Sequence, residues 1–304
     1  MFAATIAPFG TGQGRLITAE DGAALSELRP REVVAELAEA GFLLLRGFAP
    51  SLEDFSLFVK HHSDRVTLDP ARSFHGGDVA QKVDVGYDSV GLHTENGNSP
   101  FAPDLTWFLS EKAASSGSQT TVCDGYRVWD AFGERTRAAY LAQDVLYSRR
   151  VEEARWKGFV SHHSGGTKAP EDITVDDMRA LAQGQGRTVI ELLDDGAIRY
   201  DFHIPAAHPT LFGDRLAFAN SILGPSNNYE PPRITFADGT PFDAELVEET
   251  ERVTAEMTEE IVWQDGDVAL VDNTRVMHGR RPIEDPERTI YNAQSYLAAE
   301  LRSR

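Results

Sequence analysis

Two histidines and one glutamate are the residues whose types and spacing best suit metal chemistry in this sequence. His93 and Glu95 are two positions apart, and His278 follows far downstream within the segment 271–280. Residues two apart on a β-strand point to the same face, so His93 and Glu95 are expected to project together if this segment is extended. With His278 from a remote strand they would place two imidazoles and a carboxylate on one side of a metal, the facial arrangement of non-haem Fe(II) sites. The competing interpretation is an ordinary surface pair and a histidine that caps a strand.

The composition of the chain limits its partners and its compartment. Its 304 residues are 41% hydrophobic, which is enough to bury one substantial core and favours a single domain over 1–304. The formal net charge of -19 gives a surface that repels phosphate backbones and anionic lipid. Neither nucleic acid nor a membrane is therefore expected as a partner. The N-terminus has no basic region ahead of an apolar stretch, and Cys123 is the only cysteine. The sequence therefore predicts a reduced, cytoplasmic setting.

Local patterns predict helices around a set of short strands. Residues 1–14 are small and glycine-rich and are expected to be mobile, whereas 30–40 and 51–59 have the apolar spacing of helices, with Gly41 ending the first and Ser51 capping the second. Strands are predicted at 42–48, 82–85, 91–95, 105–109, 120–123, 197–202, 215–219, 260–263, 268–272 and 289–297, and further helices at 127–141 and 242–260. These elements indicate a mainly β fold with flanking helices, built on a double-stranded β-helix (jelly-roll) barrel.

A polar segment at 153–197 interrupts this pattern. It is rich in Gly, Asp and Lys and has one short helical pattern near 175–183. We interpret it as an insertion over the mouth of the barrel, where it could act as a lid.

The chain resembles the taurine dioxygenase superfamily of Fe(II)- and 2-oxoglutarate-dependent oxygenases in four short motifs. They are Gly-Phe-Leu-Leu-Leu-Arg-Gly-Phe at 41–48, Leu-His-Thr-Glu-Asn at 92–96 with Pro-Asp-Leu at 103–105, Ser-Gly-Ser-Gln-Thr at 116–120, and Asp272-Asn273 through His278-Gly279-Arg280 to Arg288. Each motif alone is weak, but their order and spacing extend the resemblance over residues 42–296.

This resemblance implies a cofactor set and a residue for each part of it. His93, Glu95 and His278 would bind Fe(II). Arg288 and Thr120 would hold the distal carboxylate of 2-oxoglutarate, and O₂ would be the other cosubstrate. A guanidinium suits that carboxylate because it donates two parallel hydrogen bonds, which a lysine cannot do. As alternatives, Arg288 could pair with a neighbouring surface acid, and Thr120 could be a plain strand residue.

Two departures from the family pattern bear on the reaction. Many members have Asp where this chain has Glu95, and a branch with Glu includes enzymes that hydroxylate amino acids. Iron halogenases of the superfamily lack this carboxylate, so Glu95 disfavours halogenation. The taurine enzyme has an arginine four residues after the position of Arg288, where this chain has Asn292, which argues against a sulfonate substrate.

The predicted function is Fe(II)- and 2-oxoglutarate-dependent oxidation of an unactivated C–H bond in a small molecule, namely an amino acid or a specialised metabolite derived from one. Hydroxylation, desaturation and ring formation share this chemistry. Asn96, Asn98, Asn220 and Asn292 are the candidate substrate contacts, because amides both donate and accept hydrogen bonds. The alternatives are a non-catalytic barrel that binds a small molecule and a metal-dependent enzyme that does not use 2-oxoglutarate.

Overall fold

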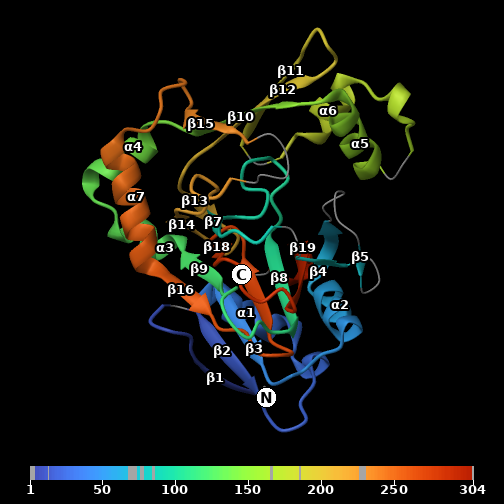
Figure 1. Ribbon diagram of the computed structural model, residues 1–304, viewed down its shortest axis with the longest axis vertical. Helices are drawn as coiled ribbons and strands as arrows, with labels where there is room; N and C mark the ends of the chain where they lie inside the picture. Colours follow the sequence, from blue (N-terminus) through green and yellow to red (C-terminus); the bar gives the residue numbers. More distant parts are fainter. Residues whose placement is uncertain are drawn as a thin grey trace.

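The computed structural model describes residues 4–302 apart from 13, 68–73, 76–78, 84–85, 165–166, 185 and 226–230. Within these residues the protein is mainly β, and its helices lie on the outside of the sheets (Figure 1). The largest sheet has the order β1-β2-β3-β17-β8-β19-β6-β5, with β4 also paired to β19. Its strands are β1 (Ala4–Pro8), β2 (Arg15–Ala19), β3 (Phe42–Arg46), β4 (Ser63–Thr67), β5 (Phe74–His75), β6 (Ala80–Lys82), β8 (Leu105–Lys112), β17 (Val268–Asp272) and β19 (Thr289–Leu297).

Three smaller sheets complete the β-structure. The first has the order β16-β9-β18-β7, the second β11-β12-β10-β15, and the third is the pair β13-β14. Their strands are β7 (Val90–His93), β9 (Thr120–Asp124), β10 (Val145–Val151), β11 (Arg187–Leu192), β12 (Ile198–Ile204), β13 (His208–Thr210), β14 (Gly213–Ala217), β15 (Arg233–Phe236), β16 (Thr258–Ile261) and β18 (Val276–Arg280). The sheet that contains β7 and β18 carries both histidines of the predicted metal site.

The first two helices form where the sequence predicts them. α1 (Pro30–Ala40) has proline at its first position, where a missing N–H is tolerated, and ends at Gly41, whose φ of 73° is left-handed. α2 (Leu52–His61) begins with a capping box, in which the Ser51 hydroxyl accepts from the Asp54 N–H and the Asp54 carboxylate accepts from the Ser51 N–H.

The other helices are α3 (Gly125–Ala131), α4 (Glu134–Ala142), α5 (Glu153–His163), α6 (Val175–Leu181) and α7 (Ala244–Met257), with 3-10 turns at Leu25–Glu27, Pro170–Asp172 and Ala299–Leu301. Among the described residues, no helix combines the length and the apolar character needed to cross a membrane.

The helix predicted over 127–141 is two helices in the structure. Phe132 separates α3 from α4 with an extended backbone, and its buried ring packs 5.0 Å from Phe218 and 5.9 Å from Tyr140. The N–H of Gly133 donates to Glu249 of α7 at 2.8 Å. Burial of a large aromatic ring stabilises a fold by roughly 1.5–3 kcal/mol, which favours the break at Phe132.

The prediction that residues 1–14 are mobile is wrong for residues 4–8. These residues form β1, which pairs antiparallel with β2 from Ala4 opposite Ala19 to Pro8 opposite Arg15. The strand is mostly exposed, so it has no apolar alternation to mark it in the sequence. Its backbone hydrogen bonds fix it in place.

Several predicted boundaries also move. The helix predicted at 242–260 ends at Met257, because β16 begins at the next residue and pairs with β9. The strand predicted at 260–263 is this β16, two residues earlier. Of the strand predicted at 82–85, residue 82 belongs to β6, and 84–85 lie outside the described residues.

The 153–197 insertion is more ordered than its polarity suggests. Besides α6, which the sequence predicts, it contains α5 and β11. Its apolar side chains Trp156, Val160, Met178 and Ile190 are buried in the same cluster as residues of β10 and β12. In Figure 1, α5 and α6 lie beside the sheet of β10, β11 and β12, at the end of the molecule opposite β1 and β2. The insertion is therefore a folded element attached to that sheet.

His62 is a buried ionisable group at the end of α2. Its side chain is fully buried, its Nδ1 donates to the Phe58 carbonyl at 2.7 Å, and its ring packs 5.4 Å from that of Trp107. Burial lowers the pKa of His62 from 6.5 to about 4. The folded protein therefore keeps this imidazole neutral over a range where the unfolded chain protonates it.

We expect His62 to reduce stability as the pH falls. Because its folded pKa lies below its unfolded pKa, its contribution to the free energy of unfolding is present above pH 6.5 and is lost between 6.5 and about 4. When the pH is lowered from about 7.5 to about 5.5, the free energy of unfolding of His62→Leu should rise by about 1.4 kcal/mol relative to that of the parent. Urea unfolding at the two pH values measures this difference. The matched control is His61→Leu, at an exposed neighbouring position. A pH-independent difference between parent and His62→Leu would contradict the expectation.

Candidate metal and cosubstrate site

Two neighbouring strands bring the histidines of the predicted triad together. His93 is the last residue of β7, and it lies directly opposite His278 of β18 in an antiparallel pair. Directly opposed residues project to the same face of a sheet, and the two ring centroids are 4.5 Å apart. Strand pairing alone therefore places both imidazoles side by side.

Glu95 reaches the histidines by a different route from the one the sequence suggested. β7 ends at His93, so Glu95 lies in the turn that follows, and the same-face argument for His93 and Glu95 does not apply. The Asn273 side chain holds this turn: the Glu95 N–H donates to Asn273 Oδ1 at 2.8 Å, and Asn273 Nδ2 donates to the Glu95 carbonyl at 3.1 Å. Asn273 Nδ2 also donates to the Pro103 carbonyl at 2.9 Å.

The donor atoms of His93, Glu95 and His278 lie within 4.8 Å of one another. His278 Nε2 is 3.3 Å from Glu95 Oε1. His93 Nδ1 is 2.8 Å from the Gly91 carbonyl, which can only accept, so Nδ1 carries the proton and Nε2 keeps its lone pair for a metal. Two imidazole nitrogens and one carboxylate oxygen on converging side chains fit Fe(II).

These three residues line a cavity of about 450 Å³. The predicted residues Asn96, Asn98, Thr120, Arg288 and Asn292 line it too. Asn220 is not among its described lining residues. Its side chain instead donates to the Ala206 carbonyl at 2.9 Å and accepts from the Ile222 N–H at 3.1 Å, so in the structure it stabilises a turn.

Thr120 and Arg288 meet at the same cavity from different strands. Thr120 begins β9, and its hydroxyl accepts a hydrogen bond from Trp263 Nε1 at 3.0 Å. Arg288 precedes β19, is 7% exposed, and donates to the Val83 carbonyl at 3.1 Å. The burial of Arg288 argues against the surface ion pair that the sequence left open.

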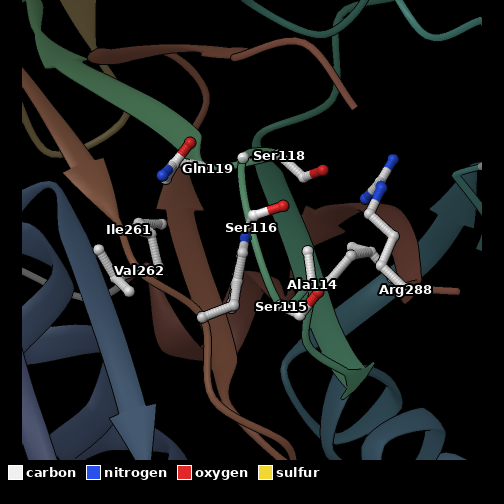
Figure 2. A pocket seen from close by; sticks show the side chains of 11 residues that line it. Ala114, Ser115, Ser116, Ser118, Gln119, Ile261, Val262 and Arg288 are labelled. Carbon is white, nitrogen blue, oxygen red and sulfur yellow. The ribbon is translucent and has the colours of Figure 1, made fainter. Parts of the chain in front are cut away.

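A smaller pocket of about 90 Å³ lies beside Arg288 (Figure 2). The loop 114–119 forms one wall, and the hydroxyls of Ser116 and Ser118 point toward the side on which Arg288 lies. The Ser118 hydroxyl is buried without a hydrogen-bond partner among the described residues. Arg288 therefore lines two spaces, the main cavity and this smaller pocket with its serine hydroxyls.

Four amide side chains extend the polar wall of the main cavity. Asn96 Nδ2 donates to Gln294 Oε1 at 3.2 Å, and Gln294 Nε2 donates to Glu95 Oε2 at 2.8 Å. Asn98 is 5% exposed, and its Nδ2 has no hydrogen-bond partner in the described part of the protein. Asn292 Nδ2 is 3.4 Å from the Trp107 carbonyl. Of these side chains, Gln294 was not predicted from the sequence, although it lies two residues after Asn292 and so on the same face of β19.

Arg280 was also missed as part of the cavity wall. It is two residues after His278 on β18, and its Nη2 donates to the carbonyls of Gly86 at 3.0 Å and Asp88 at 2.8 Å. This guanidinium therefore holds the loop that borders the cavity on that side.

Comparisons with known proteins agree with this site. The family model described as taurine catabolism dioxygenase TauD, TfdA family matches residues 6–294. A clavaminate synthase-like protein of Arabidopsis thaliana is 34% identical over 279 residues, which cover 84% of this chain and 81% of that protein.

Solved structures with the same fold have much lower identity. A putative alpha-ketoglutarate-dependent taurine dioxygenase from Burkholderia xenovorans has a TM-score of 0.65 at 14% identity, over 97% of this chain and 90% of that chain. PvcB from Pseudomonas aeruginosa has a TM-score of 0.64 at 13% identity, over 98% and 93%. Another structure of PvcB, reported as an Fe, alpha-ketoglutarate dependent oxygenase from an isonitrile synthetic pathway, has a TM-score of 0.63 at 14% identity, over 98% and 93%.

The family match and the His93, Glu95 and His278 group together confirm the predicted cofactor set of Fe(II) and 2-oxoglutarate. The chain belongs to the taurine catabolism dioxygenase TauD, TfdA family.

Proposed function

We propose that this protein is a 2-oxoglutarate-dependent non-haem iron dioxygenase that oxidises an unactivated C–H bond of an amino acid or of a specialised metabolite derived from one. The observation that carries the proposal is the convergence of His93, Glu95 and His278 in the cavity that Thr120 and Arg288 also line. A protein that only binds a small molecule needs neither a complete facial triad nor a buried guanidinium beside it.

Different residues of the chain bind the metal and 2-oxoglutarate. His93, Glu95 and His278 hold the metal on one side, which leaves the cavity side for ligands. When bound, iron supplies the O₂ chemistry that oxidises the substrate while 2-oxoglutarate is converted to succinate and CO₂. Arg288 grips the distal carboxylate of 2-oxoglutarate with two parallel hydrogen bonds.

Thr120 completes this carboxylate clamp. Trp263 Nε1 donates to the Thr120 hydroxyl oxygen, so one lone pair of that oxygen is used and its O–H proton remains available for another acceptor. Because Thr120 lines the cavity with Arg288, the carboxylate of 2-oxoglutarate is the acceptor we assign to it.

We assign the scaffold to a double-stranded β-helix barrel in one domain, with the 153–197 insertion as a lid. The insertion contacts the turn that follows Glu95. The Phe159 ring of α5 lies 4.9 Å from that of Phe101, and a side chain at Gly184 would meet the Pro100 carbonyl. Movement of the insertion would therefore displace Asn96 and Asn98, which lie in the same turn.

This contact predicts an effect of Gly184→Ala. The added Cβ would lie 2.5 Å from the Pro100 carbonyl oxygen, so the insertion must shift away from the turn. We expect limited proteolysis within 153–197 to become several-fold faster than in the parent. Gly158→Ala is the matched control, since nothing lies within 4 Å of a Cβ there and alanine favours the helix by about 1 kcal/mol. Equal cleavage of the two variants would show that the contact does not hold the insertion.

The substrate class follows from the amides of the cavity. Asn292 stands where the taurine enzyme has an arginine, and Asn96 and Asn98 add neutral donors and acceptors. A wall of this kind suits a zwitterionic or amide-bearing molecule better than a simple sulfonate.

The proposal is tested in two steps. Protein, Fe(II) and 2-oxoglutarate mixed without O₂ should give the weak visible charge-transfer band of this complex. Air should then give succinate in proportion to oxidation of one compound in a panel of amino acids, their derivatives and taurine. Absence of both signals would favour a binding protein or a metal-dependent enzyme that does not use 2-oxoglutarate. Taurine as the best substrate would overturn the amino-acid assignment.

A further inference from the structure

The two oxygens of the Glu95 carboxylate have different surroundings. Oε1 lies 3.3 Å from His278 Nε2, on the side of the histidines. Oε2 accepts a hydrogen bond of 2.8 Å from Gln294 Nε2. One oxygen therefore lies beside His278, and the second is bonded to a residue of β19.

The hydrogen bonds around Gln294 fix the direction of its amide. Gln294 lies in the middle of β19, between β8 and β4, where it pairs with Thr106 on one side and Thr67 on the other. It is 7% exposed. Asn96 Nδ2 donates to Gln294 Oε1 at 3.2 Å, which leaves Nε2 as the group that faces Glu95. An amide assigned by such a network cannot be reversed without losing both hydrogen bonds.

We propose that Gln294 is a positioning residue for the metal ligand Glu95. Its hydrogen bond keeps Oε2 directed toward β19, so that only Oε1 of Glu95 is available to bind the metal. This inference rests on the proposed role of Glu95 as an iron ligand. Partners of this kind commonly set metal affinity, and their loss weakens binding by roughly 10–100-fold.

Chain geometry gives this role to Gln294 rather than to Asn273. Asn273 binds only the backbone of Glu95, so it places the residue but not its carboxylate. The Gln294 side chain donates a hydrogen bond to the carboxylate itself, and it comes from a strand whose register is set by pairing with β8. A rigid strand can hold one carboxylate oxygen more accurately than the turn that carries Glu95.

The test compares metal affinity with folding. Gln294→Met keeps the length of the side chain and removes the donor. Anaerobic titration with Fe(II), and with Mn(II) as a redox-inert probe, should give a dissociation constant at least tenfold above that of the parent. Ser295→Ala is the matched control: Ser295 is the next residue on β19 and bonds Trp107 and Ser63 instead of Glu95. It should lower the melting temperature of the metal-free protein without changing the dissociation constant.

Each outcome decides the question. A parent-like dissociation constant for Gln294→Met overturns the inference and leaves the proposed function intact, whereas a parent protein that binds neither metal overturns the proposed function itself. If Gln294→Met does not fold, Asn96→Gly takes its place, because glycine accepts the φ of 54° at this position and releases the Gln294 amide. That variant should bind both metals several-fold more weakly, and a parent-like value would overturn the inference.

Discussion

His93→Ala, Glu95→Ala and His278→Ala are each expected to lose tight Fe(II) binding while the protein stays folded. Each substitution removes one of three donors that lie within 4.8 Å of one another, and a metal held by two protein donors dissociates readily. Strand pairing between β7 and β18 depends on the backbone, so these changes leave the sheet in place. Iron content of the purified proteins, measured beside circular dichroism spectra, checks both halves of the expectation.

His61→Ala is the matched control for the triad, since His61 is an exposed histidine on α2 and should leave the iron content unchanged. Near-parent iron in any two of the three triad variants would overturn the assignment of the site. Glu95→Ala should also fail to become an efficient halogenase, although it vacates a coordination position. Chlorination by the parent protein would contradict the oxygenase proposal.

Arg288→Ala is expected to raise the 2-oxoglutarate concentration needed for half-maximal turnover at least tenfold. Arg288 is buried and lines the same cavity as the proposed metal ligands, so its loss would leave the 2-oxoglutarate carboxylate desolvated without its partner. Removal of one member of such a pair costs on the order of 2–5 kcal/mol. Anaerobic titration with 2-oxoglutarate, followed by the charge-transfer band, measures this affinity without turnover.

Arg288→Lys should recover only part of the loss, because an ammonium cannot form the parallel pair of hydrogen bonds. Arg281→Ala is the control, since the Arg281 side chain is exposed and pairs with Glu260. If Arg288→Ala titrates like the parent, the anchor lies elsewhere. Arg280 is then the next candidate, as the other arginine on the described wall of the cavity.

The convergence of the proposed ligands could be predicted because their chemistry is visible in residue types and short motifs. His93, Glu95, His278, Thr120 and Arg288 all meet at one cavity, as expected. The reason given for Glu95 was nevertheless wrong, because the strand ends at His93 and a turn carries the carboxylate. A motif can therefore predict that a carboxylate lies beside two histidines even when the local geometry assumed for it is incorrect.

The supporting residues could not be predicted in the same way. Asn273 and Gln294 contact Glu95 across 178 and 199 residues of sequence. Asn273 belongs to one of the four motifs, but the motif does not connect it to Glu95, and no local pattern distinguishes Gln294. Asn220 shows the opposite case, since its type suits a substrate contact but its hydrogen bonds hold a turn.

The outer elements could not be predicted for a different reason. The sequence around 153–163 is dominated by charged and polar residues, so the two buried side chains Trp156 and Val160 do not reveal the helix that they anchor. Similarly, no pattern marks His62 as buried. In both places tertiary packing decides the structure.

The long sequence separation within the site has a consequence for synthesis of the protein. Glu95 obtains its two amide partners only from residues 273 and 294, and His93 obtains its strand partner only from β18. Domains fold as their chain emerges from the ribosome, N-terminal part first. A growing chain therefore carries one histidine and one carboxylate for most of its translation, without a complete iron site. The proposed iron site can therefore form only after β18 has been synthesised, and chains that terminate before β18 lack it.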